Sequence, residues 1–134
     1  QSVIPFVEAK YRLDARQERR ALAGLSMGGA HTLSAGLQSL DRFSHLGVFS
    51  MGLRGDSFTQ DHKAILADPA STNQKLRLFW IACGKDDFLW EPAVRLHETL
   101  DKNGIHHVWN PTPGAHTWPV WRRYLSEFLP LLFQ

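Results

Sequence analysis

A serine, two aspartates and a histidine stand at three places where the sequence passes from an apolar run into a polar turn. Ser26 is the central residue of GLSMG, Asp86 and Asp87 end the stretch GKDD, and His116 ends PGAH. A serine hydroxyl is a weak nucleophile unless a base takes its proton, and a carboxylate behind a histidine stabilises the imidazolium that results. The chain order of serine, acid and histidine therefore predicts nucleophilic acyl-transfer chemistry.

The G-x-S-x-G pattern around Ser26 requires a strand before it and a helix after it. Residues 20–25 (RALAGL) predict a short buried strand, and residues 27–38 predict a helix. A sharp turn between them lifts the hydroxyl out of the sheet, and the helix N-terminus offers free N–H groups to a developing negative charge. The alternative is a Gly/Ser turn without chemistry, but the strand–turn–helix context favours a nucleophile.

His116 is predicted to take the proton of Ser26 and to return it to the leaving group. The choice of acid is less clear from the residues alone. Asp86 and Asp87 are adjacent in the chain, so their side chains should point in different directions. We favour Asp87 as the acid and expect Asp86 to cap the following segment or to face solvent.

The elements that must position these residues alternate between strand and helix. This alternation predicts one α/β domain over residues 1–134, an open parallel sheet of about four strands with flanking helices. The loops at the carboxyl ends of parallel strands meet at one edge of the sheet, which would bring the three polar turns together. Strands are expected at 20–25, 46–50, 76–83 and 106–110, and helices at 2–12, 27–38, 60–68, 91–103 and 118–132.

Composition narrows the classes of function. The 134 residues contain 15 Lys and Arg against 13 Asp and Glu, and the basic residues are scattered, so no nucleic-acid partner is predicted. No apolar run approaches the ~18 residues of a membrane span, so no membrane partner is predicted either. The single cysteine, Cys83, lies in an apolar run and is expected to be a buried small hydrophobic residue.

The remaining histidines predict no metal site. His106 and His107 are expected to begin a strand, where successive side chains face opposite sides, and His45, His62 and His97 lack a partner at metal-ligand spacing. His31, one helical turn past Ser26, is expected to pack or to cap. No cofactor is predicted.

Two of the five tryptophans follow the loops of the predicted acid and base. Trp90 and Trp118 are therefore candidates to line a pocket, although packing in the core or at its rim is the simpler expectation. Trp80 and Trp109 suit core positions.

Three stretches together carry a family resemblance. GLSMGG, FWIACGKDDFLWE and TPGAHTWPVWRRYLSEF resemble the esterase family of α/β hydrolases that contains feruloyl esterases, acetyl xylan esterases of carbohydrate esterase family one and enterochelin-esterase-like enzymes. The resemblance implies Ser26 as nucleophile, His116 as base and Asp87, at the fourth position of a G-x-x-D pattern, as acid. It also implies that the backbone N–H of Met27 contributes to the oxyanion hole.

The resemblance covers only the C-terminal half of a family catalytic domain, since members are roughly twice this long. In that fold a second oxyanion donor comes from a loop in the other half. The expectation is therefore a fragment that is weakly active or inactive alone. Its first strand would present an unpaired apolar edge, which predicts self-association or pairing with the missing N-terminal half.

Several functions remain open at this point. The leading one is a serine esterase acting on feruloyl, acetyl-xylan or related small-molecule or carbohydrate-linked esters. Alternatives are an enterochelin-type siderophore esterase or an acyltransferase on the same fold, and a non-catalytic fragment or binding module. The chain begins without methionine, so a leader could have been lost, and the resemblance slightly favours a secreted or periplasmic protein over a cytoplasmic one.

Overall fold

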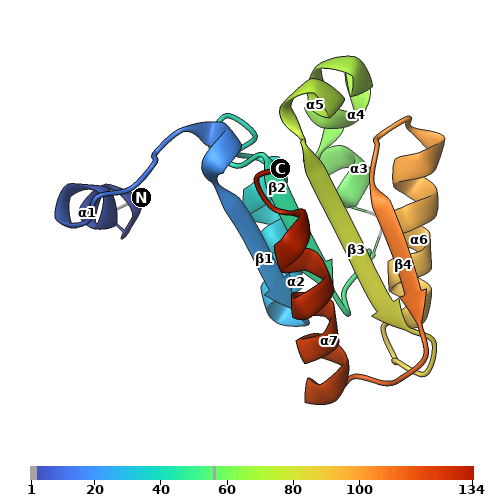
Figure 1. The fold of residues 1–134 in the computed structure, drawn as a ribbon. Helices are drawn as coiled ribbons and strands as arrows, with labels where there is room; N and C mark the ends of the chain where they lie inside the picture. Colours follow the sequence, from blue (N-terminus) through green and yellow to red (C-terminus); the bar gives the residue numbers. More distant parts are fainter. Residues whose placement is uncertain (1–2, 56) are drawn as a thin grey trace.

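A parallel sheet of four strands forms the centre of the computed structural model, which describes residues 3–55 and 57–134. The strands follow one another in space in chain order, β1-β2-β3-β4 (Figure 1). The register pairs Leu25 with Phe49, Phe49 with Ala82, and Ala82 with Asn110. The carboxyl ends of all strands therefore lie at one edge of the sheet, as the sequence predicts. The strands are β1 (Ala21–Leu25), β2 (His45–Phe49), β3 (Leu78–Gly84) and β4 (Val108–Thr112).

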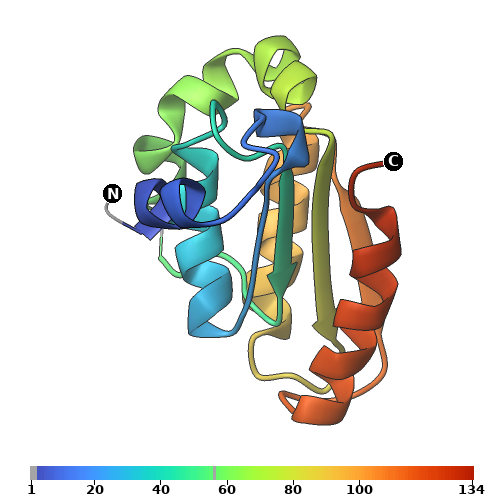
Figure 2. The same ribbon diagram turned by 60° about the vertical axis from the view of Figure 1, so that its left-hand side comes forward.

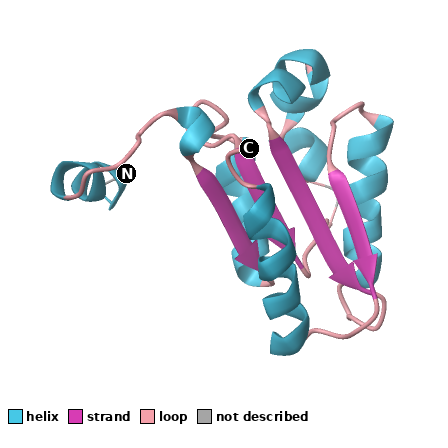
Figure 3. Ribbon diagram, in the orientation of Figure 1, coloured by secondary structure: helices cyan, strands magenta, loops and turns pink. Residues whose placement is uncertain are grey.

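Helices connect the strands and lie on both faces of the sheet (Figures 2 and 3). The first crossover begins as an α-helix and continues for five residues as a π-helix, Thr32–Gly36. The α-helices are α1 (Val3–Lys10), α2 (Met27–His31), α3 (Phe58–Asp61), α4 (Lys63–Ala67), α5 (Pro69–Lys75), α6 (Trp90–Lys102) and α7 (Trp118–Phe128). Short 3₁₀ turns occupy Gln17–Arg19 and Leu129–Leu131. No helix within residues 3–55 and 57–134 has the length and apolar character needed to cross a membrane.

The larger core lies on the face that α6 and the first crossover cover. Alternate residues of the central strands, such as Leu46 and Ile81, pack there against leucines of these helices, such as Leu33 and Leu96. Because both faces of β2 and β3 are covered, these strands are apolar almost throughout, as is typical of parallel sheets. Burying such side chains stabilises the fold by roughly 1.5–3 kcal/mol each.

The second face of the sheet is covered by α7 through an aromatic cluster. Phe49 and Trp80 from the strands pack edge-to-face with each other and against Tyr124 and Phe128 of the helix. Tyr124 also shares a hydrogen bond of 2.6 Å with the hydroxyl of Thr112. These contacts fix α7 close to the carboxyl edge, where its first turn begins.

The segment between β2 and β3 departs most from the expected elements. The single helix expected at 60–68 is broken into α3 and α4, and α5 follows without having been predicted. The side chain of Asp68 accepts a hydrogen bond from the N–H of Ser71, and Pro69 occupies the first turn of α5. This cap and proline are strong helix-start signals, but α5 buries only Thr72 and so shows almost no apolar periodicity.

Three other boundaries also differ. His106 and His107 precede β4, which begins at Val108, so the expectation that they begin a strand is wrong. α7 ends at Phe128 and passes into a 3₁₀ turn containing Pro130, because a proline lacks the N–H that a continuing helix needs. The helix expected at 2–12 ends at Lys10 and buries none of its residues.

Candidate active site

Ser26 occupies the turn between β1 and α2 in a backbone conformation that few residues adopt. Its φ is 51° and its ψ is −121°, a combination that costs on the order of 1–3 kcal/mol for a residue with a side chain. The turn is held by hydrogen bonds from Ser26 N to Phe49 O (2.9 Å) and from Ala30 N to Ser26 O (3.2 Å). The predicted strand, sharp turn and helix are all present, and the hydroxyl stands at the carboxyl edge of the sheet.

His116 reaches Ser26 from the loop after β4. Its Nε2 lies 2.9 Å from the Oγ of Ser26, within hydrogen-bonding distance. Its Nδ1 lies 2.9 Å from Oδ2 of Asp87 and 3.0 Å from Oδ1. Gly114, at φ 109°, gives the loop a turn that few other residues adopt. Three side chains from three separate strand ends thus form one hydrogen-bonded chain.

The two neighbouring aspartates differ in burial and in partner. The side chain of Asp87 is completely buried, and its Oδ1 also accepts the N–H of Leu89 at 2.9 Å. Asp86 is exposed, and its Oδ2 accepts the N–H of Gly114 at 3.2 Å. The backbone N–H of Asp86 in turn donates to Gly114 O. Asp87 therefore contacts the imidazole of His116 directly, whereas Asp86 bonds to the loop that carries His116.

Two aromatic residues that the sequence analysis did not single out pack against His116. Phe88 lies with its ring centroid 4.5 Å from the imidazole and is 75% exposed. Trp121 stands edge-on to the imidazole, with centroids 4.9 Å apart. A sequence signal for Phe88 is its place directly after the acid, and one for Trp121 is its place one helical turn after Trp118.

The two tryptophans proposed as pocket residues have different surroundings. Trp118 is 65% exposed, packs edge-to-face on Trp121, and lines a hollow of about 220 Å³ between β1 and α7. Trp90 instead packs half-buried against Trp109, with ring centroids 5.6 Å apart. Trp118 thus borders a hollow, whereas Trp90 packs against another aromatic ring.

Met27 is the first residue of α2 and is 68% exposed. The first N–H groups of a helix have no acceptor within that helix, so the N–H of Met27 is free to face an anionic oxygen. The backbone therefore places a suitable donor directly beside Ser26. The side chains of Met27, Phe88 and Trp118 are all exposed and apolar. Each lies within two residues of Ser26, Asp87 or His116 in the chain.

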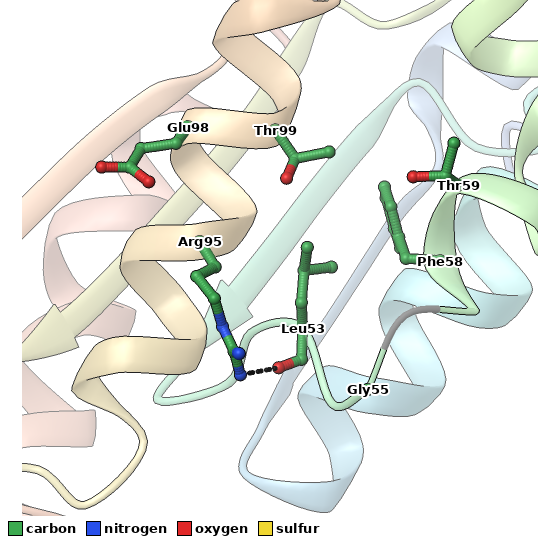
Figure 4. A pocket seen from close by; sticks show the side chains of 7 residues that line it. All are labelled: Leu53, Gly55, Phe58, Thr59, Arg95, Glu98 and Thr99. Carbon is green, nitrogen blue, oxygen red and sulfur yellow. Dashed lines mark hydrogen bonds between the residues drawn. The ribbon is translucent and has the colours of Figure 1, made fainter.

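Another hollow, of about 270 Å³, lies between α3 and α6 (Figure 4). The Arg95 side chain extends from α6 toward Leu53 and donates a hydrogen bond to Leu53 O at 3.2 Å. The hollow is lined by Leu53, Gly55, Phe58, Thr59, Arg95, Glu98 and Thr99, and so by none of the triad residues. The hydrogen-bonded side chains of Ser26, His116 and Asp87 lie elsewhere, at the carboxyl edge of the sheet.

Two histidines and the cysteine lie away from the hydrogen-bonded chain of Ser26, His116 and Asp87. His97 Nδ1 and His107 Nε2 lie 2.7 Å apart, a pairing that their sequence spacing did not predict. In the parts of the chain that the structure describes, no three His, Cys, Asp or Glu side chains are grouped as metal ligands. Burial raises the pKa of Cys83 to about 12, so its thiol is protonated near neutral pH.

A parallel sheet with a serine on a strained strand-to-helix turn, and an acid and a histidine on later strand ends, corresponds to part of the α/β-hydrolase fold. Residues 1–132 match the family model described as "Putative esterase", and the chain belongs to this esterase family.

Known relatives agree with this assignment. An acetyl esterase of Caldicellulosiruptor saccharolyticus is 25% identical over 93% of this chain and 58% of its own length. An endo-1,4-beta-xylanase/feruloyl esterase of Xylanibacter ruminicola is 28% identical over 98% of this chain and 17% of its own length. The solved structure of a ferulic acid esterase superposes with a TM-score of 0.82 at 25% identity, over all of this chain and 60% of that one. The chain thus spans less than two thirds of each of these relatives.

Proposed function

We propose that this chain carries the catalytic serine, histidine and aspartate of a carboxylic ester hydrolase. The observation that supports the proposal most strongly is the continuous hydrogen-bonded chain from Ser26 Oγ through His116 to Asp87. Each member lies where general-base activation of a serine needs it: the base touches the nucleophile, and the acid touches the far ring nitrogen.

In the proposed reaction, Ser26 Oγ attacks the ester carbonyl carbon while His116 Nε2 takes the hydroxyl proton. The carbonyl oxygen becomes an oxyanion that accepts a hydrogen bond from the N–H of Met27. The intermediate collapses, the bond to the alcohol oxygen breaks, and His116 returns the proton to that oxygen. Water then attacks the acyl-serine with the same base, releasing the acid and restoring Ser26. Asp87 stabilises the imidazolium during both steps.

The exposed apolar side chains of Met27, Phe88 and Trp118 support an ester with an aromatic or other apolar acyl group. Flat rings bind well against such side chains because aromatic contacts add to the burial of apolar area. The relatives named acetyl esterase and feruloyl esterase make acetylated and feruloylated carbohydrates the first substrates to test. Siderophore esters and acyl transfer to another acceptor use the same triad and belong in the same screen.

The rate of this chain alone is expected to be low. In this fold a second oxyanion donor comes from a loop earlier in the catalytic domain, and this chain spans only 58–60% of two of the relatives compared above. Removing one such donor typically lowers kcat by about 10² to 10³. Covalent labelling of the serine is therefore a better first test than turnover.

The test is intact mass spectrometry after incubation with a fluorophosphonate. One adduct is expected on the parent chain, and none on Ser26→Ala. His116→Ala should label at least about a hundredfold more slowly, because the serine then lacks its base. Labelling that persists in Ser26→Ala, or no labelling of a folded parent chain, would contradict the proposal and favour a binding module that lacks esterase chemistry. A positive result justifies the screen of feruloyl, acetyl-xylan and siderophore esters.

A further inference from the structure

We propose that Ser50 is a positioning residue for His116, acting through the indole of Trp121. Ser50 is the residue after β2, at the carboxyl edge of the sheet, and its hydroxyl contacts Trp121. The proposal deepens the proposed function and rests on it, because it concerns the base of the same triad.

Ser50, like Ser26, has a positive φ. Its φ is 50°, and the other non-glycine residues with positive φ in the described segments are Ser26 and Phe133. Ser50 is completely buried, and its N–H donates to Ala82 O at 2.8 Å. A buried serine held in this conformation costs free energy that a glycine would avoid. The hydroxyl is thus the feature that a serine adds here.

The hydroxyl of Ser50 bonds to Trp121, which in turn contacts His116. Trp121 Nε1–H donates to Ser50 Oγ at 2.9 Å. A half-buried indole needs an acceptor for its N–H, and this bond holds the Nε1 end of the ring in place. Trp121 then stands edge-on to the His116 imidazole, with an interplanar angle of 89° and centroids 4.9 Å apart. Trp118 packs on the same indole from the side of the hollow.

The consequence for His116 is geometric. Its two nitrogens must point to Ser26 and Asp87 at the same time, while only 19% of the His116 side chain is exposed. Phe88 contacts the imidazole at a tilt of 46° but is mostly exposed, so it supplies a weaker restraint than the held indole. A base displaced by about 1 Å can lose on the order of a hundredfold in rate. Ser50 would prevent that displacement by fixing the indole.

The test compares variants that remove each end of the Ser50–Trp121 bond. Ser50→Gly removes the hydroxyl and suits the positive φ, so relief of backbone strain offsets the loss of the indole's hydrogen bond and the melting temperature should change little. Trp121→Phe keeps a ring but removes the donor. Each is expected to lower the maximal rate of fluorophosphonate labelling at Ser26 by about tenfold, with little change in the probe concentration that gives half that rate. The double variant should be no worse than the single ones, because both remove the same contact.

The matched control is Ser44→Ala. Ser44 is also completely buried, but it lies at the opposite end of β2 and its hydroxyl donates to Gln17 O. This variant should lose stability and keep the labelling rate of the parent. A merely structural role for Ser50 predicts the reverse pattern: reduced stability with an unchanged maximal labelling rate.

A second readout does not depend on activity. In ¹⁵N-labelled protein, the Nδ1–H resonance of His116 reports its bond to Asp87, and the Nε1–H resonance of Trp121 reports its bond to Ser50. Ser50→Gly is expected to shift the indole signal and to speed solvent exchange of the His116 proton, and Ser44→Ala should do neither. If the parent chain does not label, the proposed function is refuted. The two N–H resonances still show whether Ser50 positions His116. Unchanged His116 exchange in Ser50→Gly would overturn the inference.

Discussion

At the level of single residues, the adjacent aspartates Asp86 and Asp87 have different surroundings because their side chains point in different directions. Asp87 turns inward after β3, where Leu89 N–H and His116 share its oxygens. Asp86 remains exposed, and its carboxylate bonds to the loop backbone at Gly114. One carboxylate therefore contacts the base of the proposed mechanism, and the other contacts only its supporting loop.

Replacing each aspartate by asparagine tests this division. Asp87→Asn keeps the shape but offers His116 an amide in place of a charge, so the imidazolium and the required tautomer lose their partner. We expect fluorophosphonate labelling of Ser26 to slow by about 10³-fold or more. Asp86→Asn keeps an oxygen for the Gly114 N–H and should slow labelling less than about tenfold. Equal losses in the two variants would contradict the assignment of Asp87.

The residues that contact one another in the site were not equally predictable. Ser26, Asp87 and His116 carry a signal because each follows an apolar run that ends in a polar turn. Phe88, Trp121 and Ser50 carry none of comparable strength, since their roles arise from contacts between segments far apart in the chain. The bond from Trp121 to Ser50 joins residues 71 positions apart and depends on how α7 lies across the sheet.

At the scale of elements, the strand-to-helix turn around Ser26 requires close approach of two backbones. A Cβ at Gly24 would lie 2.2 Å from Gly28 O, whereas a Cβ at Gly28 would meet nothing within 4 Å. The two flanking glycines of the motif are therefore not equivalent. The first is required by packing, and the second is tolerated in a helix at some cost in propensity.

This difference predicts opposite effects of alanine. Gly24→Ala forces strand and helix apart and should lower the free energy of unfolding by about 3 kcal/mol. Gly28→Ala should leave it unchanged or raise it by up to about 1 kcal/mol, because alanine favours a helix. Urea denaturation followed by circular dichroism measures both. Equal destabilisation by the two substitutions would show that the close approach at Gly24 is not the constraint.

The order of elements was predictable, and their ends were less so. All four strands lie within two residues of the expected positions, and the signal is strongest for β3, a nearly continuous apolar run bounded by glycine. The region from α3 to α5 was harder, since these short helices bury few residues and show little periodicity. The π-helical continuation of α2 leaves no mark that distinguishes it from an α-helix in the sequence.

At the scale of the whole molecule, buried histidines link stability to pH. Burial lowers the pKa of His45, His62 and His107 below the usual 6.5. The unfolded chain therefore binds more protons than the folded chain as the pH falls below about 6.5. By linkage, the free energy of unfolding is highest above that pH and decreases as the pH falls from 6.5 toward the lowered values.

His62 offers a test of this linkage. It packs against Phe58 with ring centroids 4.6 Å apart, and within the described residues its Nδ1 has no hydrogen-bond partner. His62→Phe keeps a ring and removes the titration, so stability should decrease less between pH 7 and pH 5 than in the parent. Gly28→Ala changes no titratable group, so it supplies the control and should keep the slope of the parent. Urea midpoints at both pH values measure the effect, and an unchanged slope in His62→Phe would contradict it.

The two edge strands of the described sheet, β1 and β4, differ in how well they are protected against pairing with another chain. β4 carries Pro111, which has no N–H to offer another strand, and proline on an edge discourages pairing. β1, with sequence ALAGL, has neither a charge nor a proline. Beside it lies the hollow lined by Trp118 and Leu125, both exposed. An unprotected edge next to exposed apolar side chains favours association through β1 and not through β4.

Matched lysine substitutions separate the two edges. Ala23 is exposed on β1 and Val108 is exposed on β4, so either position accepts a lysine without burying its charge. We expect the parent chain to gain mass with concentration in sedimentation velocity, Ala23→Lys to remain monomeric, and Val108→Lys to behave like the parent. A parent that stays monomeric at all concentrations would contradict self-association. Suppression by Val108→Lys alone would move the contact to β4, where Pro111 would then have to lie outside the paired segment.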